Sequence, residues 1–259
     1  MQGQSPWNPN KEKRRNMRIS RVYTDSPLEI DCSLQLGAVV SHYLAHVLRL
    51  AVADRVHLFN GRDGEFDAQI THISKHEVWV LLRQQLRGPE ATALRINLGL
   101  GLSRGDRMDF AIQKSTELGV CSITPLTTQH GEVKLKAERI ENKLRHWRKI
   151  AVGASEQSGR LDVPEICSPT TVADWHDSNA EGLNLLLEPG GQDQFPASTG
   201  DSARINLLIG PEGGFSEQEI KWGRDQHFSI VGLGTRILRT ETAPIAALSI
   251  LQYLYGDMK

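Results

Sequence analysis

The sequence predicts an α/β protein in which a small, mainly β barrel precedes a larger domain with a largely parallel sheet. Before residue 87, short segments alternate apolar and polar residues with the period of a strand. Beyond residue 92, strand-like and helix-like segments follow one another, as in parallel sheets covered by helices on both faces. Between them, glycine and proline punctuate a polar stretch, which marks a domain boundary. We therefore place the first domain at residues 17–88 and the second at residues 89–259.

Composition narrows the class of protein. The chain has 259 residues, a formal net charge of −1 and 39% hydrophobic residues, and no window approaches the ~18 consecutive apolar residues of a membrane-spanning helix. Its three cysteines are far apart and in no Cys-x-x-Cys spacing, so neither a disulfide framework nor a zinc site is expected. Residues 1–16 lack the apolar stretch of a secretory signal and are predicted to form a disordered leader. These features fit a protein of the reducing cytoplasm.

The first domain is predicted to consist mostly of short strands. Phe66, Ala68 and Ile70 alternate with polar neighbours, which is the period of a half-buried strand. The glycines of residues 60–64 supply a turn before them. We expect strands at residues 18–24, 55–59, 65–73 and 77–82. Strands this short and this close together predict a small barrel.

One helix is expected to interrupt these strands. Ser41 can cap it, and Leu44 and Leu48 recur at helical spacing beyond the cap. His42 and His46 lie one turn apart, a spacing also found in metal sites. Neither the glutamate of a His-Glu-x-x-His motif nor a third ligand accompanies them, so no metal is expected.

The second domain alternates strands and helices. Strands are expected at residues 94–102, 120–126, 184–187, 205–209 and 230–233, and helices at 106–118, around 140–150 and at 241–255. Gly119 follows the first of these helices at a position typical of a carboxyl cap. Ser216 and Glu219 have the spacing of a capping box and predict the start of a further helix.

Two loops of the second domain point to a ligand site. The apolar run 207–209 opens into Gly-Pro-Glu-Gly-Gly-Phe, and residues 233–243 read Leu-Gly-Thr-Arg-Ile-Leu-Arg-Thr-Glu-Thr-Ala. Each follows a buried strand and precedes a helix, which is where open α/β sheets bind their ligands. The first loop has neither Gly-x-Gly-x-x-Gly nor a Gly-Lys-Ser/Thr ending, so a dinucleotide or triphosphate site is disfavoured. The two loops together predict one pocket.

With Leu-Leu-Leu-Glu-Pro-Gly at residues 186–191, these loops resemble the three cofactor loops of the SPOUT class of S-adenosylmethionine-dependent RNA methyltransferases. Within that class the chain is most similar to the bacterial RsmE family, which methylates N3 of a uridine in small-subunit ribosomal RNA. The resemblance extends from about Met17 to the end of the chain. It implies a PUA-like barrel that binds RNA, a SPOUT domain with a carboxyl-terminal trefoil knot, S-adenosylmethionine as cofactor and a homodimer.

The resemblance also assigns the cofactor to backbone groups and apolar side chains of these loops. The expected cofactor-binding residues are Leu187, Glu188, Ile209, Gly210, Pro211, Glu212, Gly213, Leu233, Gly234, Ile237, Leu238, Thr242 and Ala243. Glu212 would either favour the positive sulfonium electrostatically or pair with a neighbouring group of the protein.

Methylation of uridine at N3 requires that the N3 proton leave, so a base or a stabilised anion is needed. Glu241 and Glu212 are the candidate proton acceptors. Arg239, or Arg236 beside it, can stabilise negative charge on the uracil carbonyl oxygens. We hypothesise that Arg239 orients uracil and that Glu241 supports it.

Positive residues are the candidates for contact with RNA. They are Arg18, Arg21, Arg104, Arg160 and Arg236, and a second cluster of Lys134, Lys136, Arg139, Lys143, Arg145, Arg148 and Lys149. Such clusters can neutralise phosphates, but a solvated helix face has the same pattern. Arg160 would likewise be either an RNA contact or a solubilising loop residue.

We therefore predict a cytoplasmic, S-adenosylmethionine-dependent methyltransferase that modifies N3 of one uridine in 16S ribosomal RNA, with the RNA of the small ribosomal subunit as its partner; the sequence does not distinguish free RNA from the assembled subunit. It is expected to act as a homodimer, without metal or membrane. The apolar stripe of the final helix fits either a dimer interface or burial within one subunit; it comprises Ile245, Leu248, Leu251 and Leu254. Two alternatives stay open: a non-catalytic RNA-binding ribosome-assembly factor, and a SPOUT methyltransferase for another base or a ribose 2′-hydroxyl.

Overall fold

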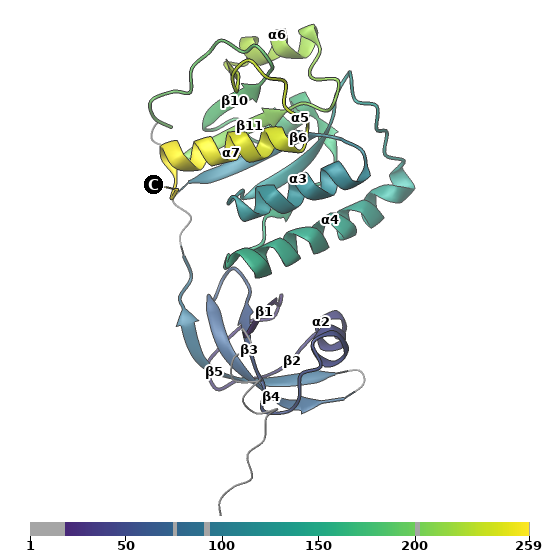
Figure 1. Ribbon diagram of the computed structural model, residues 1–259, viewed down its shortest axis with the longest axis vertical. Coiled ribbons are helices and arrows are strands. Elements are labelled where there is room, and N and C mark those ends of the chain that lie inside the picture. Colours follow the sequence, from purple (N-terminus) through teal and green to yellow (C-terminus); the bar gives the residue numbers. More distant parts are fainter. Residues whose placement is uncertain (1–18, 75–76, 91–93, 200–202, 259) are drawn as a thin grey trace, which may run out of the picture. The chain divides into compact units, whose positions relative to one another are not determined.

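The computed structural model describes residues 19–74, 77–90, 94–199 and 203–258 (Figure 1). The chain divides into two compact units, Met1–Pro89 and Glu90–Lys259. The predicted leader at residues 1–16 lies outside the described residues, as do Met17 and Arg18. Within the described residues, no helix combines the length and apolar character needed to cross a membrane.

The first unit is built on a five-stranded sheet in the order β1-β3-β4-β5-β2. Its strands are β1 Ser20–Tyr23, β2 Ser33–Gln35, β3 Arg55–Phe59, β4 Glu65–Ile73 and β5 Val78–Arg87. Strand β1 runs parallel to β3, whereas the β3–β4, β4–β5 and β2–β5 pairs are antiparallel. The alternating residues Phe66, Ala68 and Ile70 are all buried, as their spacing predicts.

The polar neighbours of these residues on β4 are buried too, which the alternation did not predict. Glu65 and Asp67 are each only 4% exposed. Arg21 donates to Glu65 at 2.5 Å, and Arg55 donates to Asp67 at 2.7 Å. His57 lies near both carboxylates, and its partial burial lowers its pKa below the ordinary value. Cations thus cover this face of the sheet, because buried carboxylates need opposite charges nearby.

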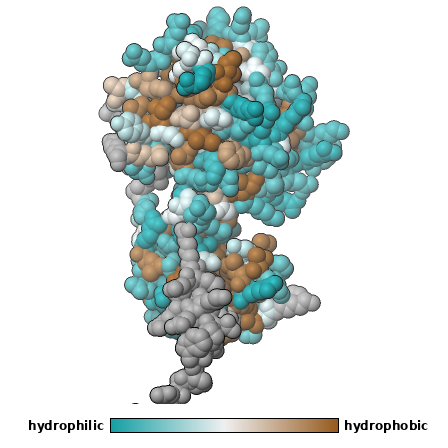
Figure 2. All heavy atoms as spheres, viewed as in Figure 1, coloured by the Kyte–Doolittle hydropathy of each residue, from teal (hydrophilic) through white to brown (hydrophobic). Residues whose placement is uncertain are grey.

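The helix of the first unit begins earlier than its sequence predicts. Helix α2 spans Ala38–His42 with Gly37 at its amino cap, so the prediction that Ser41 caps it is wrong. The Ser41 hydroxyl instead donates to the Leu36 carbonyl and accepts from the Val78 amide, which ties the helix to β5. A π-helical turn, η1 Tyr43–Val47, continues the chain. Figure 2 shows apolar side chains gathered over this segment, and Val39, Tyr43 and Val47 are exposed there.

The second unit contains a seven-stranded sheet in which every pair is parallel, as predicted. Its strands are β6 Arg95–Gly101, β7 Ser122–Thr127, β8 Glu165–Ile166, β9 Thr170–Thr171, β10 Leu183–Leu187, β11 Arg204–Ile209 and β12 Ser229–Val231. The order is β12-β10-β11-β6-β7-β8, and β9 pairs with β7. The carboxyl-terminal halves of the central strands carry only apolar residues or glycine, because they are buried on both faces, whereas arginine and asparagine residues lie nearer the strand starts.

Helices cover both faces of this sheet (Figure 1). Helices α3 Gly105–Glu117, α4 Ala137–Ser158 and α7 Thr242–Tyr255 pack on one face, and α5 Val172–Asp177 and α6 Glu217–Asp225 on the other. Neighbouring side chains of one strand point to opposite faces. Accordingly Leu207 and Ile209 belong to the core under α3 and α7, whereas Leu208 belongs to the core under α5 and α6. Leu118 is the carboxyl cap of α3, and Gly119, with φ +85°, follows it in the left-handed conformation that glycine commonly supplies at a helix end.

Four strands end together at one edge of the sheet. The register pairs Leu187 with Ile209, Ile209 with Leu100, and Leu187 with Val231. The segments that follow β6, β10, β11 and β12 therefore meet at this edge, although the sequence separates the first from the last by about 130 residues. The sheet topology thus gathers the predicted cofactor loops with the first turn of α3.

Candidate functional site

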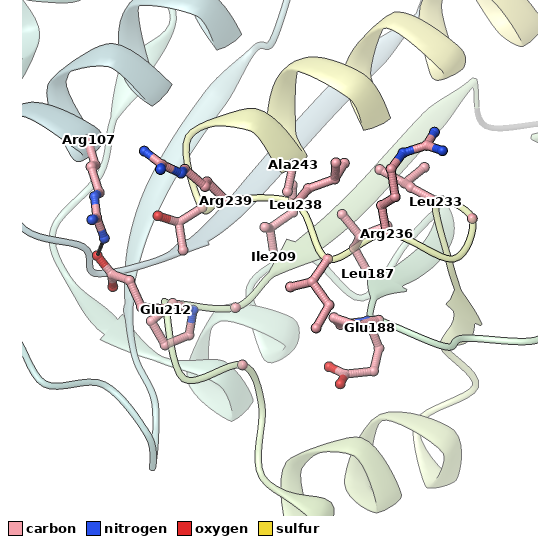
Figure 3. A pocket seen from close by; sticks show the side chains of 17 residues that line it. Arg107, Leu187, Glu188, Ile209, Glu212, Leu233, Arg236, Leu238, Arg239 and Ala243 are labelled. Carbon is pink, nitrogen blue, oxygen red and sulfur yellow. Dashed lines mark hydrogen bonds and ion pairs between the residues drawn. The ribbon is translucent and has the colours of Figure 1, made fainter.

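A cavity of about 380 Å³ lies at the carboxyl ends of these strands (Figure 3). Its walls come from three loops, the first turn of α3 and the start of α7. The lining residues are Arg107, Leu187, Glu188, Pro189, Ile209, Gly210, Pro211, Glu212, Gly214, Leu233, Gly234, Arg236, Ile237, Leu238, Arg239, Thr240 and Ala243. The predicted loops therefore form one pocket.

The loop after β11 is held in place by its own turn and by the helix that follows. The Gly214 amide donates to the Pro211 carbonyl at 2.9 Å. Ser216 and Glu219 form the predicted capping box, in which each side chain accepts from the backbone amide of the other residue. The loop also passes so close to β6 that a Cβ atom on Gly101 would lie 2.3 Å from the Pro211 nitrogen. Only glycine at position 101 permits this approach.

The loops after β10 and β12 are fixed against each other. The Glu188 amide donates to the Val231 carbonyl at 3.0 Å, and the Asp193 amide donates to the Ile230 carbonyl at 3.1 Å. The Asp193 carboxylate accepts from the Ile230 amide at 2.6 Å. Farther along the third loop, the Arg239 carbonyl accepts from the amides of Thr242 and Ala243 and so begins α7. Segments distant in sequence thus form one rigid rim.

One end of the cavity is charged. Arg107, on the first turn of α3, lies 3.0 Å from Glu212 and 4.0 Å from Glu241. Figure 3 shows Arg107 facing Glu212, with Arg239 near them. The Thr240 hydroxyl also donates to Glu241 at 3.3 Å. Glu212 thus makes a local ion pair with Arg107, and its predicted contact with the sulfonium stays a prediction.

The other end of the cavity is lined mostly by apolar side chains, with Arg236 and one unusual carboxyl group, that of Glu188, among them (Figure 3). Leu187, Ile209 and Leu238 line this region, with Glu188 beside them (Figure 3). One oxygen of Glu188, Oε2, is buried and lacks a hydrogen-bond partner among the described residues. Burial raises the pKa of Glu188 above its ordinary value, and a hydrogen bond from the Phe215 backbone partly opposes that rise. A buried oxygen without a partner is costly unless a ligand supplies a donor.

The structure places most of the predicted cofactor residues on the cavity wall. Gly213 and Thr242 do not line it. The Gly213 carbonyl instead lies 3.1 Å from Nδ1 of His130, and Thr242 is an exposed residue at the start of α7. Of the three candidate catalytic residues, Arg239 and Glu212 line the cavity, and Glu241 reaches its charged end through Arg107.

The five arginines predicted to contact RNA lie in different settings. Arg236 lines the cavity and is exposed, and Arg104 is exposed and pairs with Glu132 at 2.6 Å. Arg21 stacks on the Phe59 ring, 4.6 Å from its centre, in addition to its pair with Glu65. The fourth, Arg18, lies outside the described residues.

Arg160 is held within the protein. Its side chain is only 12% exposed. The guanidinium donates to the Thr116 carbonyl at 2.7 Å and to the Val120 carbonyl at 2.9 Å, and it pairs with Asp162. These bonds join the end of α4 to the turn after α3, so the residue has a structural role that its loop position did not suggest.

The second positive cluster lies mainly on α4. Lys136 is the amino cap of this helix, and Arg139, Arg145, Arg148 and Lys149 are exposed along it. Figure 2 shows a hydrophilic surface over α4. The helix therefore carries a solvated cationic face while Trp147 and Ala151 bury its other side.

Four lining residues were missed by the sequence analysis: Arg107, Pro189, Gly214 and Thr240. Pro189, Gly214 and Thr240 lie inside the three quoted loop motifs, next to residues that were predicted, but were not themselves assigned to the site. Arg107 has no such local signal. Its contact with Glu212 spans 105 positions, and only the side-by-side placement of β6 and β11 brings the two together.

Comparison with known protein families gives two matches. Residues 90–252 match the family described as the RNA methyltransferase domain. Residues 40–83 match the family described as the RNA methyltransferase PUA domain. The two matches fall in the two compact units of the fold, respectively the second and the first.

Several curated proteins that share one name are similar to this chain over most of its length. The ribosomal RNA small subunit methyltransferase E of Buchnera aphidicola subsp. Schizaphis graminum is 35% identical over 243 residues, which cover 93% of this chain and 98% of that protein. The protein of that name from Bacillus subtilis is 30% identical, with 83% of this chain and 90% of that protein covered.

Two solved structures are similar in fold as well as sequence. A methyltransferase from Legionella pneumophila in complex with the bound cofactor SAM has 36% identity and a TM-score of 0.85, with 92% of this chain and 98% of that chain covered. The ribosomal RNA small subunit methyltransferase E from Neisseria gonorrhoeae bound to S-adenosyl methionine has 32% identity and a TM-score of 0.83. That match covers 93% of this chain and all of the other.

Proposed function

The chain belongs to the ribosomal RNA small subunit methyltransferase E family of RNA methyltransferases, and we propose from this premise that it transfers a methyl group from S-adenosylmethionine to N3 of a uridine in 16S ribosomal RNA. One observation carries the proposal: the loops of three parallel strands enclose a single cavity with an apolar end and a charged end. That arrangement suits a cofactor that is a nucleoside at one end and charged at the other.

The residues of the cavity fit S-adenosylmethionine. Leu187, Ile209 and Leu238 provide apolar surface for a purine ring, and the adjoining loops offer backbone groups for its edge. Oε2 of Glu188, which no residue in the described ranges satisfies, provides a hydrogen-bond acceptor. When bound, the cofactor supplies a methyl group made electrophilic by the neighbouring sulfonium. The protein then mainly has to hold the acceptor nitrogen in line with that methyl.

Arg239 is proposed to orient the uracil and to stabilise negative charge on its carbonyl oxygens as the N3 proton leaves. It is exposed at the mouth of the cavity, where a base from RNA could reach it. Glu241 is proposed to support this step, with Glu212 as the second candidate proton acceptor. Arg107 contacts both carboxylates and would hold them in position at the charged end.

RNA is proposed to bind through the first unit and through the cationic face of α4. A target base can reach the cavity only when it is unstacked, which is easiest in a single-stranded or loop region. Arg104 and Arg236 are exposed and could bind RNA phosphates. The ion pair of Arg104 with Glu132 would not prevent this, because both side chains are exposed and such a pair is weak. We also propose a cytoplasmic location, a homodimer and the trefoil knot of the class.

Calorimetry with the full chain tests the cofactor. S-adenosylmethionine, or S-adenosylhomocysteine as its demethylated product, should bind the protein alone with measurable heat. A non-catalytic assembly factor that uses these loops only as scaffold would give no heat.

Mass mapping of ribosomal RNA tests the acceptor. RNA from a strain lacking this gene should lack one methyluridine that is present in the parent strain, and purified protein should restore it. Loss of a methyl group from another base or from a ribose would identify a different acceptor and contradict the assignment to uridine N3.

A further inference from the structure

Glu188 is held by its backbone at the start of the first cofactor loop. It is the first residue after β10. Its amide donates to the Val231 carbonyl, and its carbonyl accepts from the Gly191 amide, both at 3.0 Å. Because both backbone groups are engaged, the side chain has a fixed origin on the cavity wall.

One oxygen of the Glu188 carboxylate accepts a hydrogen bond from the protein, and the other is available to a ligand. The Phe215 backbone amide supplies one hydrogen bond. The second oxygen, Oε2, is buried and has no partner in the part of the chain that the structure describes. By contrast, Glu212 and Glu241 both face Arg107. Glu188 therefore differs from the other cavity carboxylates in having an acceptor that nothing in the described protein satisfies.

We propose that Glu188 accepts a hydrogen bond from a ribose hydroxyl group of the methyl donor and thereby selects a ribonucleoside. This inference rests on the proposed function, and it names the residue that would recognise the ribose of the methyl donor. A buried acceptor that gains a donor only in the complex discriminates strongly against a ligand that lacks the donor.

The position of Glu188 favours the sugar over the amino acid part of the donor. Glu188 lies beside Leu187 and Ile209 at the apolar end, whereas Arg107, Glu212 and Arg239 lie at the other end (Figure 3). The purine suits the apolar end, and the charged amino acid part suits the charged end. The ribose is bonded directly to the purine, so its hydroxyl groups are the donors expected nearest to Glu188.

The test is calorimetry on the full chain with ligands that differ by one group. The ligands are S-adenosylhomocysteine, its 2′-deoxy and 3′-deoxy analogues, and 5′-methylthioadenosine, which keeps the ribose but lacks the amino acid. They are titrated into wild type, Glu188→Leu and Glu188→Gln. Glu217→Gln, at an exposed site on α6 outside the cavity, is the matched control.

Wild type and the control variant should bind at least one deoxy analogue about tenfold more weakly than S-adenosylhomocysteine, or about 1.4 kcal/mol, because that analogue leaves the acceptor oxygen of Glu188 without its donor. In Glu188→Leu this ratio should fall to near one. Glu188→Gln has almost the same shape and keeps an acceptor oxygen, so its ratio should be intermediate. It also keeps the test valid if the leucine variant folds poorly.

Three results would overturn the inference. Equal binding of all ribose variants by wild type would show that no hydroxyl is read. A wild-type ratio retained in both Glu188 variants would assign the reading to another group. Weaker binding of S-adenosylhomocysteine by Glu188→Leu, with 5′-methylthioadenosine unaffected, would assign Glu188 to the ammonium group. Absence of heat with every adenosine compound would instead remove the proposed function, and this inference with it.

Discussion

At the scale of single residues, the cavity carboxylates differ in what compensates their charge. Glu212 and Glu241 face the guanidinium of Arg107, which offsets the loss of water around them. Glu188 has a backbone hydrogen bond and one oxygen that no described residue satisfies, and burial raises its pKa. A group that is poorly compensated in the free protein can become well compensated in a complex. Such residues therefore contribute to ligand binding and not to the stability of the free protein.

Replacing Arg239 with alanine should abolish turnover and leave cofactor binding nearly intact. Arg239 is exposed at the charged end of the cavity, so its loss removes a cation without opening the core. Loss of a fixed charge that acts in the transition state costs roughly 100-fold to 1,000-fold in rate. Turnover is measured with unmethylated ribosomal RNA, and cofactor affinity by calorimetry. Full activity in Arg239→Ala, with activity lost in Arg236→Ala, would transfer the role to Arg236.

Replacing Glu188 with glutamine should stabilise the ligand-free protein at neutral pH. The pKa of Glu188 is raised by folding above its ordinary value of 4.5, so the folded protein binds this proton more tightly than the unfolded chain. Stability is therefore lost as the pH rises from about 4.5 through the raised pKa. Above that window, Glu188→Gln should be more stable by less than about 1 kcal/mol, because solvent at this partly exposed site screens much of the cost of the charge, and below pH 4.5 the difference should vanish.

Denaturant unfolding without ligand, at neutral pH and near pH 4, measures this difference. The glutamine side chain keeps an oxygen for the Phe215 amide, so the native hydrogen bond is conserved. A variant that is less stable than wild type at neutral pH would show that the ionised carboxylate of Glu188 does not lower the stability of the free protein.

Replacing Arg160 with alanine should destabilise the second unit. The substitution leaves the Val120 carbonyl without this donor and Asp162 without its cation, and it removes one of two donors to the Thr116 carbonyl, which also accepts from the Gly119 amide at 3.1 Å. A loss of about 2 kcal/mol is expected from the unsatisfied Val120 carbonyl and from the lost hydrogen bonds of a charged donor. Thermal unfolding measures it, with the exposed Arg224→Ala on α6 as control. Unchanged stability together with weaker RNA binding would favour the role that the sequence predicted.

At the scale of elements, the long strands and helices could be predicted because they carry a clear period. Strands β3 and β4 have the predicted bounds. Helix α3 begins and ends one residue earlier than predicted, and α7 begins one residue later. Strands β2, β8 and β9 were missed, since two or three residues show no period. The early start of α2 was missed because Gly37 caps it without a side chain.

The two glycine-rich loops were found because their signal is local. The roles of Arg107 and Arg160 depend on contacts across 105 and 40 or more positions, which no local pattern encodes. Loop motifs therefore locate the site, while the packing of elements against the loops decides which further residues complete it.

Gly101 should be essential for the shape of the cofactor cavity. A Cβ atom there would lie 2.3 Å from the Pro211 nitrogen and 2.7 Å from the Gly210 carbonyl carbon. Because these are backbone atoms, Gly101→Ala must displace the whole loop or strand β6. We expect at least a tenfold loss of cofactor affinity, measured by calorimetry.

Gly153→Ala is the matched control for that substitution. Gly153 lies on the exposed side of α4, with nothing within 4 Å of the added atom. Alanine in a helix interior is favoured over glycine by up to about 1 kcal/mol, so this variant should be slightly more stable and should bind as wild type does. Normal binding by Gly101→Ala would show that the loop yields without harm to the site.

At the scale of the whole molecule, the apolar stripe of α7 was expected to form a dimer interface or to be buried within one subunit, and each explanation fits a different part of the helix. Leu248 and Leu251 are fully buried within the second unit, so burial in one subunit accounts for them. Tyr253 and Leu254 are 65% and 42% exposed. Large apolar side chains grouped on a surface are typical of protein interfaces. The end of α7 is therefore the part of the stripe that a dimer would cover.

A homodimer should have twice the 28.8 kDa mass of one chain in light scattering at micromolar concentration. Replacing both Tyr253 and Leu254 with lysine should yield a monomer with unchanged circular dichroism, because both side chains lie outside the core. Like charges would face each other across a twofold interface, where the same patch occurs on both subunits. Val52→Lys, at an exposed apolar site of the first unit, is the control and should stay dimeric. A monomeric wild type would refute the dimer, and a dimeric double variant would place its interface elsewhere.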